Sequence, residues 1–277
     1  MTDTIPHGYI STLLACRLVL LNKKDSGISS VGAGECLQRI IGKTITGLLK
    51  EDIIHAVGTL QTSAGLESGI EAAIHAVRKS FEEASSECLL VVDADNAFNK
   101  LNRNVSLENI KRLCPPIYTY LHNSYSTPTM VYLDNVNHIL SQEGVMQGDN
   151  AAMAMYALST RPLIQALSKE TANDEVKQVW YADGSSAVGS LAGAKKWWEY
   201  LQAYGPDFGY CPKPAKTILL IKDSSLMQAA QKIFKDDEIK ITNQGERLLG
   251  SVIGTESFRE QYIKTRLRVG YNTFNRS

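Results

Sequence analysis

Apolar residues recur in two patterns in the first half of the chain, and each pattern predicts a different element. From residue 66 onward the spacing becomes three and four residues, which is typical of a helix with one apolar face, at Ile70, Ile74, Val77 and Phe81. Residues 87–93 read ECLLVVD, a short continuous apolar run that ends in an acid. A run this short and rich in Val and Leu indicates a buried strand. We therefore expect a helix that leads into a buried strand.

The second half of the chain predicts further strands separated by helices. Strands are indicated at 176–182, 186–188 and 217–221, and helices over about twenty residues from Asp149 and over 192–204. Asp183-Gly184 is a turn pair between two of the strands. From 87 to 221 the order is thus strand, helix, two strands, helix, strand. This order predicts an α+β fold, a split βαββαβ arrangement in which helices back an antiparallel sheet.

The flanking regions give less regular patterns. Residues 7–50 mix apolar stretches with several glycines, which favours loops and short helices. Ser106 is expected to cap a short helix that ends before Pro115-Pro116. Two hairpins are also expected, one formed by 129–133 and 137–140 around Asp134-Asn135, the other by 238–242 and 247–253.

Composition narrows the class of protein. The chain has 277 residues, 44% of them hydrophobic, and lacks the run of about eighteen apolar residues that a membrane helix needs. Its start does not read as a secretion signal, and its five cysteines lack paired spacing, so we expect an intracellular protein, nuclear or cytoplasmic, with no membrane segment. Lys plus Arg equals Asp plus Glu at 29 each. A nucleic-acid-binding protein usually carries a basic excess, so any such binding here must come from a local basic groove.

Two acids occupy notable places in the predicted sheet. Asp93 ends the first strand, and Asp183 lies at the turn between the two central strands. Neighbouring strands would bring both carboxylates to one edge, and carboxylate oxygens are the ligands that Mg²⁺ prefers. Two such ions about 3.5–4 Å apart can activate a hydroxyl and stabilise a leaving group. Without further motifs, the simpler interpretation is that Asp93 ends a strand and Asp183 shapes a turn.

Five motifs extend this pattern. They are DADNAFNKLNR (93–103), EGVMQGDN (143–150), VWYADG (179–184), GYCPKPAKT (209–217) and LLGSVIG (248–254). Each motif alone is a weak signal, but their order and spacing resemble the successive sequence blocks of reverse transcriptases, most closely those of non-LTR retrotransposons. The resemblance covers residues from about 10 to 260. It implies an RNA-directed DNA polymerase, a nucleotidyltransferase with fingers in 1–86, a palm in 87–254 that includes a fingers-side helical insertion at about 104–140, and a truncated start of the thumb in 255–277.

The resemblance also implies roles for individual residues. Asp93 and Asp183 would be catalytic metal ligands for Mg²⁺, with Mn²⁺ as an alternative ion, and Lys216 would protonate the leaving pyrophosphate. The nucleotide-binding positions would be Asp95, Phe98, Gln147 and Gly148, with Phe98 selecting deoxynucleotides. Contacts to nucleic acid would come from Arg39, Lys43, Leu249 and Gly250, although surface charge explains Arg39 and Lys43 equally well. The expected partners are an RNA or DNA template with its primer and deoxynucleoside triphosphates.

Three positions depart from the pattern of the family. Gly184 stands where the Y-A-D-D turn has its second aspartate, Ser29 where an arginine grips the triphosphate, and Asn150 where proline is usual. A missing carboxylate should weaken metal binding and misplace the primer hydroxyl. Asp95 lies two residues beyond Asp93 and on an extended strand would share its face, so it is a possible substitute. The sequence thus leaves three hypotheses: a polymerase, impaired in this copy; a non-catalytic remnant of a retroelement that binds nucleic acid at most; or an unrelated nucleic-acid-binding α+β module.

Overall fold

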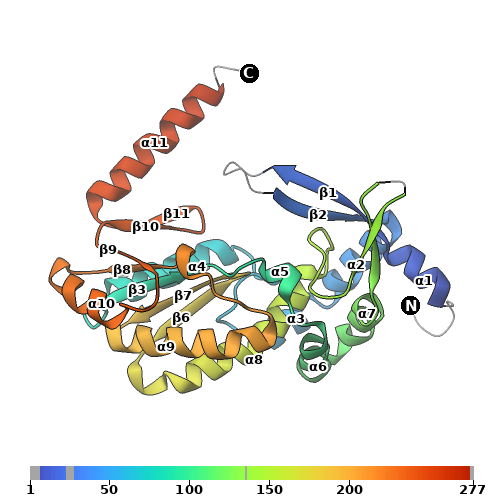
Figure 1. Ribbon diagram of the computed structural model, residues 1–277, viewed down its shortest axis with the longest axis horizontal. Helices are drawn as coiled ribbons and strands as arrows, with labels where there is room; N and C mark the ends of the chain where they lie inside the picture. Colours follow the sequence, from blue (N-terminus) through green and yellow to red (C-terminus); the bar gives the residue numbers. More distant parts are fainter. Residues whose placement is uncertain (1–6, 23–27, 135, 275–277) are drawn as a thin grey trace. The chain divides into compact units, whose positions relative to one another are not determined.

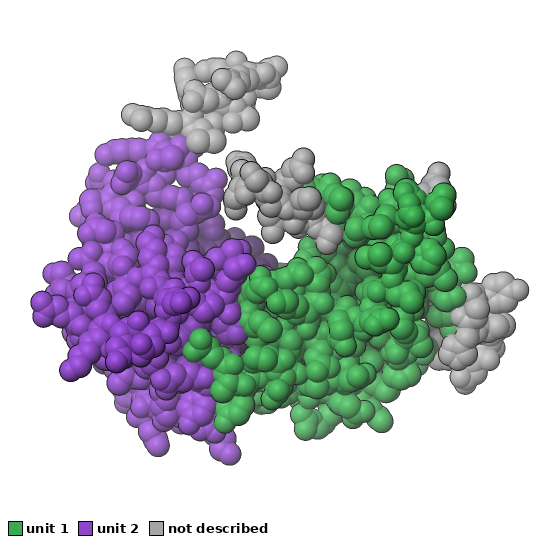
Figure 2. All heavy atoms as spheres, in the orientation of Figure 1, with its two compact units in different colours: residues 1–69, 94–166, 202–211 green, residues 70–93, 167–201, 212–277 purple. Residues whose placement is uncertain are grey.

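The computed structural model describes residues 7–22, 28–134 and 136–274. The chain folds into two compact units, each assembled from separate segments (Figure 2). Unit 1 comprises 1–69, 94–166 and 202–211, and unit 2 comprises 70–93, 167–201 and 212–277. The fingers, palm and thumb boundaries expected from the sequence stay predictions. No helix among the described residues combines the length and the apolar character needed to cross a membrane.

Unit 2 is built around a five-stranded mixed sheet (Figure 1). In spatial order its strands are β6 (Lys177–Tyr181), β7 (Gly184–Gly189), β3 (Cys88–Val92), β8 (Ile218–Ile221) and β9 (Lys240–Thr242). The first four pair antiparallel, and β9 runs parallel to β8. The central strand β3 is almost completely buried because it has a neighbour on each side, as its continuous apolar sequence predicted. The α+β fold class is confirmed.

Helices cover both faces of this sheet. The register aligns Leu89 of β3 with Val188 and Leu220 on its neighbours, and this row packs against Val77 and Phe81 of α4 (Gly69–Glu82). Helix α9 (Leu191–Tyr204) supplies fully buried tryptophans, and one of them contacts the indole of β6, with the ring centroids of Trp180 and Trp197 6.1 Å apart. The sheet therefore lies between α4 and α9, because alternate residues of each strand point to opposite faces.

The prediction that 238–242 and 247–253 form a hairpin was wrong. Residues 240–242 form β9 and join the large sheet beside β8. The hairpin instead consists of β10 (Gly245–Leu248) and β11 (Ser251–Gly254), with a left-handed turn in which Leu249 has φ 49° and Gly250 φ 85°. Leu248 and Ile253 of this hairpin bury against the α4 face of the sheet, and this long-range packing decided the pairing. Helices α10 (Met227–Ile233) and α11 (Glu256–Phe274) complete unit 2.

Unit 1 contains a four-stranded sheet in the order β2-β1-β4-β5. Its strands are β1 (Cys16–Asn22), β2 (Ile28–Gly34), β4 (Thr129–Tyr132) and β5 (His138–Ser141). The β4–β5 hairpin confirms the sequence prediction, with the Asp134 carboxylate accepting from the backbone N–H groups of Val136 and Asn137; Asn135 lies outside the described residues. The expectation that residues 7–50 form only loops and short helices was wrong. The glycine-containing strand β2 pairs with β1 along its length.

Helices make up the rest of unit 1. They are α1 (His7–Leu14), α2 (Cys36–Leu48), α3 (Lys50–Val57), α5 (Ala97–Lys100), α6 (Arg103–Leu113), α7 (Pro115–Tyr125) and most of α8 (Ala152–Glu170). The prediction that Ser106 caps α6 was wrong. The Asn102 side chain accepts from the Val105 N–H at 3.2 Å, while the Ser106 hydroxyl donates to the Asn102 carbonyl inside the helix.

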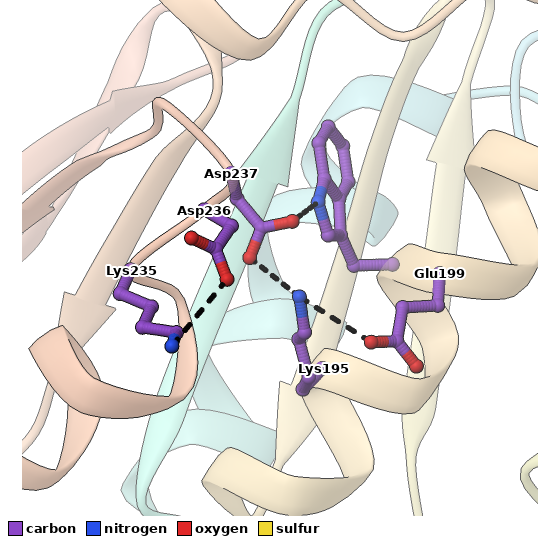
Figure 3. A network of polar contacts seen from close by, with 6 residues as sticks. Lys195, Glu199, Lys235, Asp236 and Asp237 are labelled. Atoms are coloured by element: carbon purple, nitrogen blue, oxygen red, sulfur yellow. Dashed lines mark hydrogen bonds and ion pairs between the residues drawn. The ribbon is translucent and has the colours of Figure 1, made fainter.

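A polar network anchors the segment after α10 to α9 (Figure 3). The Asp237 carboxylate accepts from the indole N–H of Trp198 at 2.8 Å and from the Lys195 ammonium at 2.6 Å. Asp237 is 8% exposed and Trp198 fully buried. By contrast, the neighbouring Asp236 carboxylate is 82% exposed and lies 3.9 Å from Lys235.

We expect Asp237→Ala to lower the free energy of unfolding by about 2–3 kcal/mol, because it leaves a buried indole N–H and an ammonium without their acceptor. Asp236→Ala is the matched control, with an expected change within about 0.5 kcal/mol, since exposed pairs contribute little. Urea denaturation of both variants measures the difference. Equal stability of the two variants would contradict the structural role of Asp237.

Candidate functional site

The two predicted acids come together at one edge of the unit 2 sheet. Strand β3 pairs with β7 as far as Val92 and Ser185, and Asp93 follows directly. Strands β6 and β7 are joined by a tight turn in which Ala182 has φ 53°, and Asp183 is the second residue of that turn. Because β3 and β7 are antiparallel, the end of β3 lies beside the start of β7. Both carboxylates are half-buried at this edge.

Gly184 begins β7 at the same edge and has an ordinary strand-like backbone. It pairs with Tyr181 across the hairpin, and its φ lies outside the left-handed region that favours glycine. A Cβ atom placed there would have a single close neighbour, the Tyr181 carbonyl oxygen at 3.4 Å. The backbone therefore does not require glycine at this position, and a Cβ atom fits there.

Lys216, which the resemblance assigns to protonation of the leaving pyrophosphate, lies beside Asp93. Its ammonium is 3.0 Å from the Asp93 carboxylate. The loop that carries it is fixed to the same residue, because the Lys213 N–H donates to the Asp93 carbonyl at 2.9 Å, and the Thr217 hydroxyl donates to the Lys213 carbonyl at 3.0 Å. Both members of the ion pair are about half exposed, so water screens the pair and a stronger ligand could displace either partner.

A cavity of about 150 Å³ adjoins Asp93 and Gly184 on the α4 side of the sheet. Its polar wall includes Asp93, Gly184 and Arg247, and its apolar wall includes Val77 and Leu248. Among the described residues, no group of three or more His, Cys, Asp or Glu side chains is placed to hold a metal ion. Asp93 and Asp183 are the carboxylates that this edge of the sheet offers to a cation.

The remaining predicted nucleotide-binding residues lie in unit 1. The Phe98 ring of α5 stacks on Tyr156 of α8, with centroids 4.6 Å apart and planes at 22°. The Asp95 carboxylate is 2.7 Å from the Lys100 ammonium, which raises the pKa of that lysine through the hydrogen bond. Phe98 is thus fixed by an aromatic partner, and Asp95 has an ion pair of its own.

The Gln147-Gly148 loop approaches strand β2 closely. The Gly32 N–H donates to the Gln147 carbonyl at 2.7 Å. Gly148 has φ 112°, and a Cβ atom there would lie 2.5 Å from the Gly32 carbonyl oxygen. Glycine is therefore required at position 148 by the protein's own backbone. Asn150, found where proline is usual in the family, donates from its amide to the Arg39 carbonyl at 2.6 Å and so ties this segment to α2.

The predicted nucleic-acid contacts are divided between the two units, and all but the partly buried Leu249 are exposed. Arg39 and Lys43 lie four residues apart on α2, on the same exposed side of the helix. Leu249 and Gly250 form the turn of the β10–β11 hairpin in unit 2. Ser29 pairs with Leu21 in the β1–β2 hairpin.

Sequence reasoning missed a buried network beneath the 141–149 segment. Arg103, at the first turn of α6, is 4% exposed and donates to the Gly144 carbonyl at 2.7 Å and to the Ser141 carbonyl at 2.8 Å. Burial lowers the pKa of its guanidinium. Its charged group lies 5.4 Å from the Tyr125 ring centroid, and the Tyr125 hydroxyl donates to Asp149. Burial raises the pKa of Tyr125 well above its ordinary value, so the hydroxyl stays protonated as the donor. Arg103 ends one of the quoted motifs, but nothing in its local sequence marked it as buried.

A second group missed by sequence reasoning lies at the surface of unit 2. Arg247 of β10 and Arg266 of α11 both lie beside the ring of Tyr262. The hydrogen bond from Arg266 and the charges of both guanidiniums lower the pKa of the Tyr262 hydroxyl. The three residues are separated by up to 19 positions in the sequence, and no motif joined them.

Comparison with known proteins identifies the fold. No protein-family model and no curated protein matches the chain. Among solved structures, a telomerase from Candida tropicalis truncated from its C-terminal domain matches with a TM-score of 0.58 over 92% of this chain, at 11% identity. A Candida albicans telomerase in complex with a fragment of telomeric RNA matches with a TM-score of 0.59 over 91% of this chain, at 12% identity. The matches cover 55% and 47% of those telomerase chains, so this chain spans about half their length. The chain has a reverse-transcriptase-like α+β fold.

Proposed function

We propose that this chain is a reverse transcriptase domain of the non-LTR retrotransposon type, in which template-directed DNA synthesis is impaired by the glycine at position 184. The observation that carries the proposal is the meeting of Asp93 and Asp183 at one sheet edge, with Gly184 as their neighbour. The telomerase-like fold supports the broader class, and the five ordered motifs support the retrotransposon type.

The acids fit a role in holding one divalent ion. Asp93 and Asp183 offer the hard oxygen donors that Mg²⁺ or Mn²⁺ prefers, and Mg²⁺ is commonly held by one or two carboxylates together with substrate phosphates. When bound, such an ion would neutralise phosphate charge and lower the pKa of a primer hydroxyl. A second ion would have one carboxylate fewer, since position 184 contributes none. Lys216 would leave Asp93 and donate its proton to the departing pyrophosphate.

The residues proposed to bind the incoming nucleotide lie in unit 1. Phe98, fixed against Tyr156, would lie beneath the sugar of an incoming deoxynucleoside triphosphate and exclude a 2′-hydroxyl. Gln147 and Gly148 would lie against the base pair. Ser29 can offer one hydrogen bond where an arginine would offer a charged fork, so we expect weak triphosphate affinity.

The proposed partners are an RNA or DNA template and its primer. Arg39 and Lys43 present two cations on one side of α2, and the Leu249-Gly250 turn would contact the primer. Telomerases of the same fold from two Candida species have been solved with a fragment of telomeric RNA, which favours a nucleic acid partner for this chain.

The alternative is a non-catalytic remnant of a retroelement that keeps the fold and binds nucleic acid at most. Gly184 and the occupation of Asp93 by Lys216 favour it. An unrelated nucleic-acid-binding α+β module fits less well, because the telomerase likeness extends over nine-tenths of the chain.

Primer extension on an RNA template with a DNA primer tests the proposal. We expect slow incorporation by the unaltered chain with Mg²⁺, faster incorporation with Mn²⁺, and none above background for Asp93→Ala. The Asp93–Lys216 pair is about half exposed and contributes little to stability, so this variant should fold normally, and its thermal midpoint checks that. If the unaltered chain incorporates nucleotides no faster than Asp93→Ala, the result would favour the non-catalytic alternative.

A further inference from the structure

A cavity of about 510 Å³ lies in unit 2 at the opposite end of the sheet from Asp93. Its wall is formed by residues from the segments 80–86, 174–177 and 188–190, and we refer to it as the distal cavity. Gly189 lines it and pairs with Cys88 at the start of β3, whereas Asp93 follows the other end of that strand. The volume lies in the range of small-molecule sites, about 300–1,000 Å³.

In the described part of the chain, three carboxylates and one ammonium line the distal cavity. Two of the acids have lysine partners, Glu83 with Lys177 and Asp174 with Lys196. These four side chains are 29–51% exposed, so water screens both pairs and another cation can displace the lysines. The Glu175 carboxylate has no partner among the described residues. The cavity therefore has a local excess of negative charge in a chain whose net charge is zero.

The three carboxylates do not converge on one point. Among the described residues, no group of three or more His, Cys, Asp or Glu side chains is placed to hold a metal ion, and a single ion needs all its ligands within about 2.6 Å. Acids spread around a wall instead match a cation that is itself extended and carries several separated charges.

Ser86 gives independent evidence of a ligand in the distal cavity. It lines the cavity and is 6% exposed, and its hydroxyl has no hydrogen-bond partner in the described part of the chain. Ser190 on the same wall differs, since its hydroxyl accepts from the Gly193 N–H at 3.0 Å. Buried polar groups in native proteins almost always have a partner, so an unpaired hydroxyl beside a cavity indicates that a bound polar group completes it.

We propose that the distal cavity binds a small linear polyamine, with one ammonium group at Glu175 and Ser86 and the others at Glu83 and Asp174. An ammonium group has three donors and no acceptor, so carboxylate and hydroxyl oxygens match it. The methylene groups between the charges would lie against Val176 and Val188. Because the cavity is at the opposite end of β3 from Asp93, the inference requires neither template binding nor catalysis.

Isothermal titration of the full chain with spermidine at constant ionic strength tests the proposal. We expect saturable binding with one molecule per chain. Glu175→Gln should weaken it about tenfold, because a charge-assisted hydrogen bond is lost. Asp236→Asn is the matched control, since this acid of the same unit is 82% exposed and lies outside the cavity wall, and it should leave the affinity unchanged. Butylamine, which carries a single charge, should bind at least about tenfold more weakly than spermidine.

Ser86→Ala separates ligand binding from a structural role of the hydroxyl. The substitution removes a buried group that has no partner, so without spermidine the variant should be at least as stable as the unaltered chain. Its affinity for spermidine should nevertheless fall about fivefold. Thermal midpoints measured with and without spermidine show both effects, because a ligand that binds only the folded state raises the midpoint.

Four outcomes would overturn the inference. The first is the absence of saturable binding. The second is an equal loss of affinity in Asp236→Asn, which would indicate attraction by diffuse charge. The third is displacement of spermidine by Mg²⁺ at constant ionic strength, which would indicate a metal site. The fourth is an unchanged affinity in Ser86→Ala, which would mean that the hydroxyl binds water only. Polyamine binding by a chain that extends no primer would keep this inference and overturn the proposed chemistry alone.

Discussion

Gly184→Asp is expected to raise template-directed incorporation by about two orders of magnitude over the unaltered chain in the presence of Mg²⁺, because a misplaced reacting group costs a polymerase about that much in rate. The substitution adds a third carboxylate at the sheet edge that already carries Asp93 and Asp183. The Gly184 backbone is ordinary, and the added Cβ would meet only the Tyr181 carbonyl oxygen, at 3.4 Å. Single-turnover primer extension measures the change.

Metal binding gives a second measurement for the same variant. Three neighbouring carboxylates repel one another without a cation, so Gly184→Asp should be less stable than the unaltered chain in the absence of metal. A ligand that binds only the folded state stabilises it, so added Mg²⁺ should raise the thermal midpoint of the variant more than that of the unaltered chain.

Gly184→Asn is the matched control, since it has the same shape without the charge. It should show neither the faster incorporation nor the larger Mg²⁺-dependent rise in thermal midpoint. A natural chain that already extends primers as fast as Gly184→Asp would show that Asp93 and Asp183 suffice, and would contradict the proposed impairment.

Arg103→Leu is expected to lower the free energy of unfolding by about 3–5 kcal/mol, the largest stability effect that we predict. The substitution removes three hydrogen bonds, to the Gly144 carbonyl and to the carbonyl and hydroxyl of Ser141, and leaves buried acceptors unpaired. It also removes the cation beside Tyr125, whose hydroxyl binds Asp149. Urea denaturation followed by circular dichroism measures the loss.

Two further variants separate the fork geometry of Arg103 from its charge. Arg103→Lys keeps the charge but cannot reproduce the three directed hydrogen bonds, so it should still lose more than about 1 kcal/mol. Arg112→Gln changes an exposed arginine of the same helix, whose guanidinium lies 3.3 Å from Asn109, and should change stability by less than about 0.5 kcal/mol. A loss in Arg112→Gln equal to that in Arg103→Leu would contradict the role given to the buried guanidinium.

Local sequence patterns predicted the elements at the centre of the candidate site. The apolar run before Asp93 and the turn pair at Asp183-Gly184 are short-range signals, because burial of a strand and the backbone of a tight turn depend on adjacent residues. They were sufficient to place Asp93 at the end of β3 and Asp183 in the β6–β7 turn. The proximity of Lys216 to Asp93, by contrast, emerged only from the structure.

Contacts between distant segments decided the rest, and no local pattern encodes them. Residues 240–242 alternate like a hairpin strand, but pairing with β8 placed them in the large sheet. Arg103 is a surface residue by type, and only the approach of the 141–144 segment buried it among carbonyl acceptors. Arg247 and Arg266 became one cluster because the hairpin packs against α11. The sequence by itself thus determined which residues end strands and form turns, whereas the tertiary structure decided which distant side chains meet, since hydrogen bonds and charge pairs depend on distance in space.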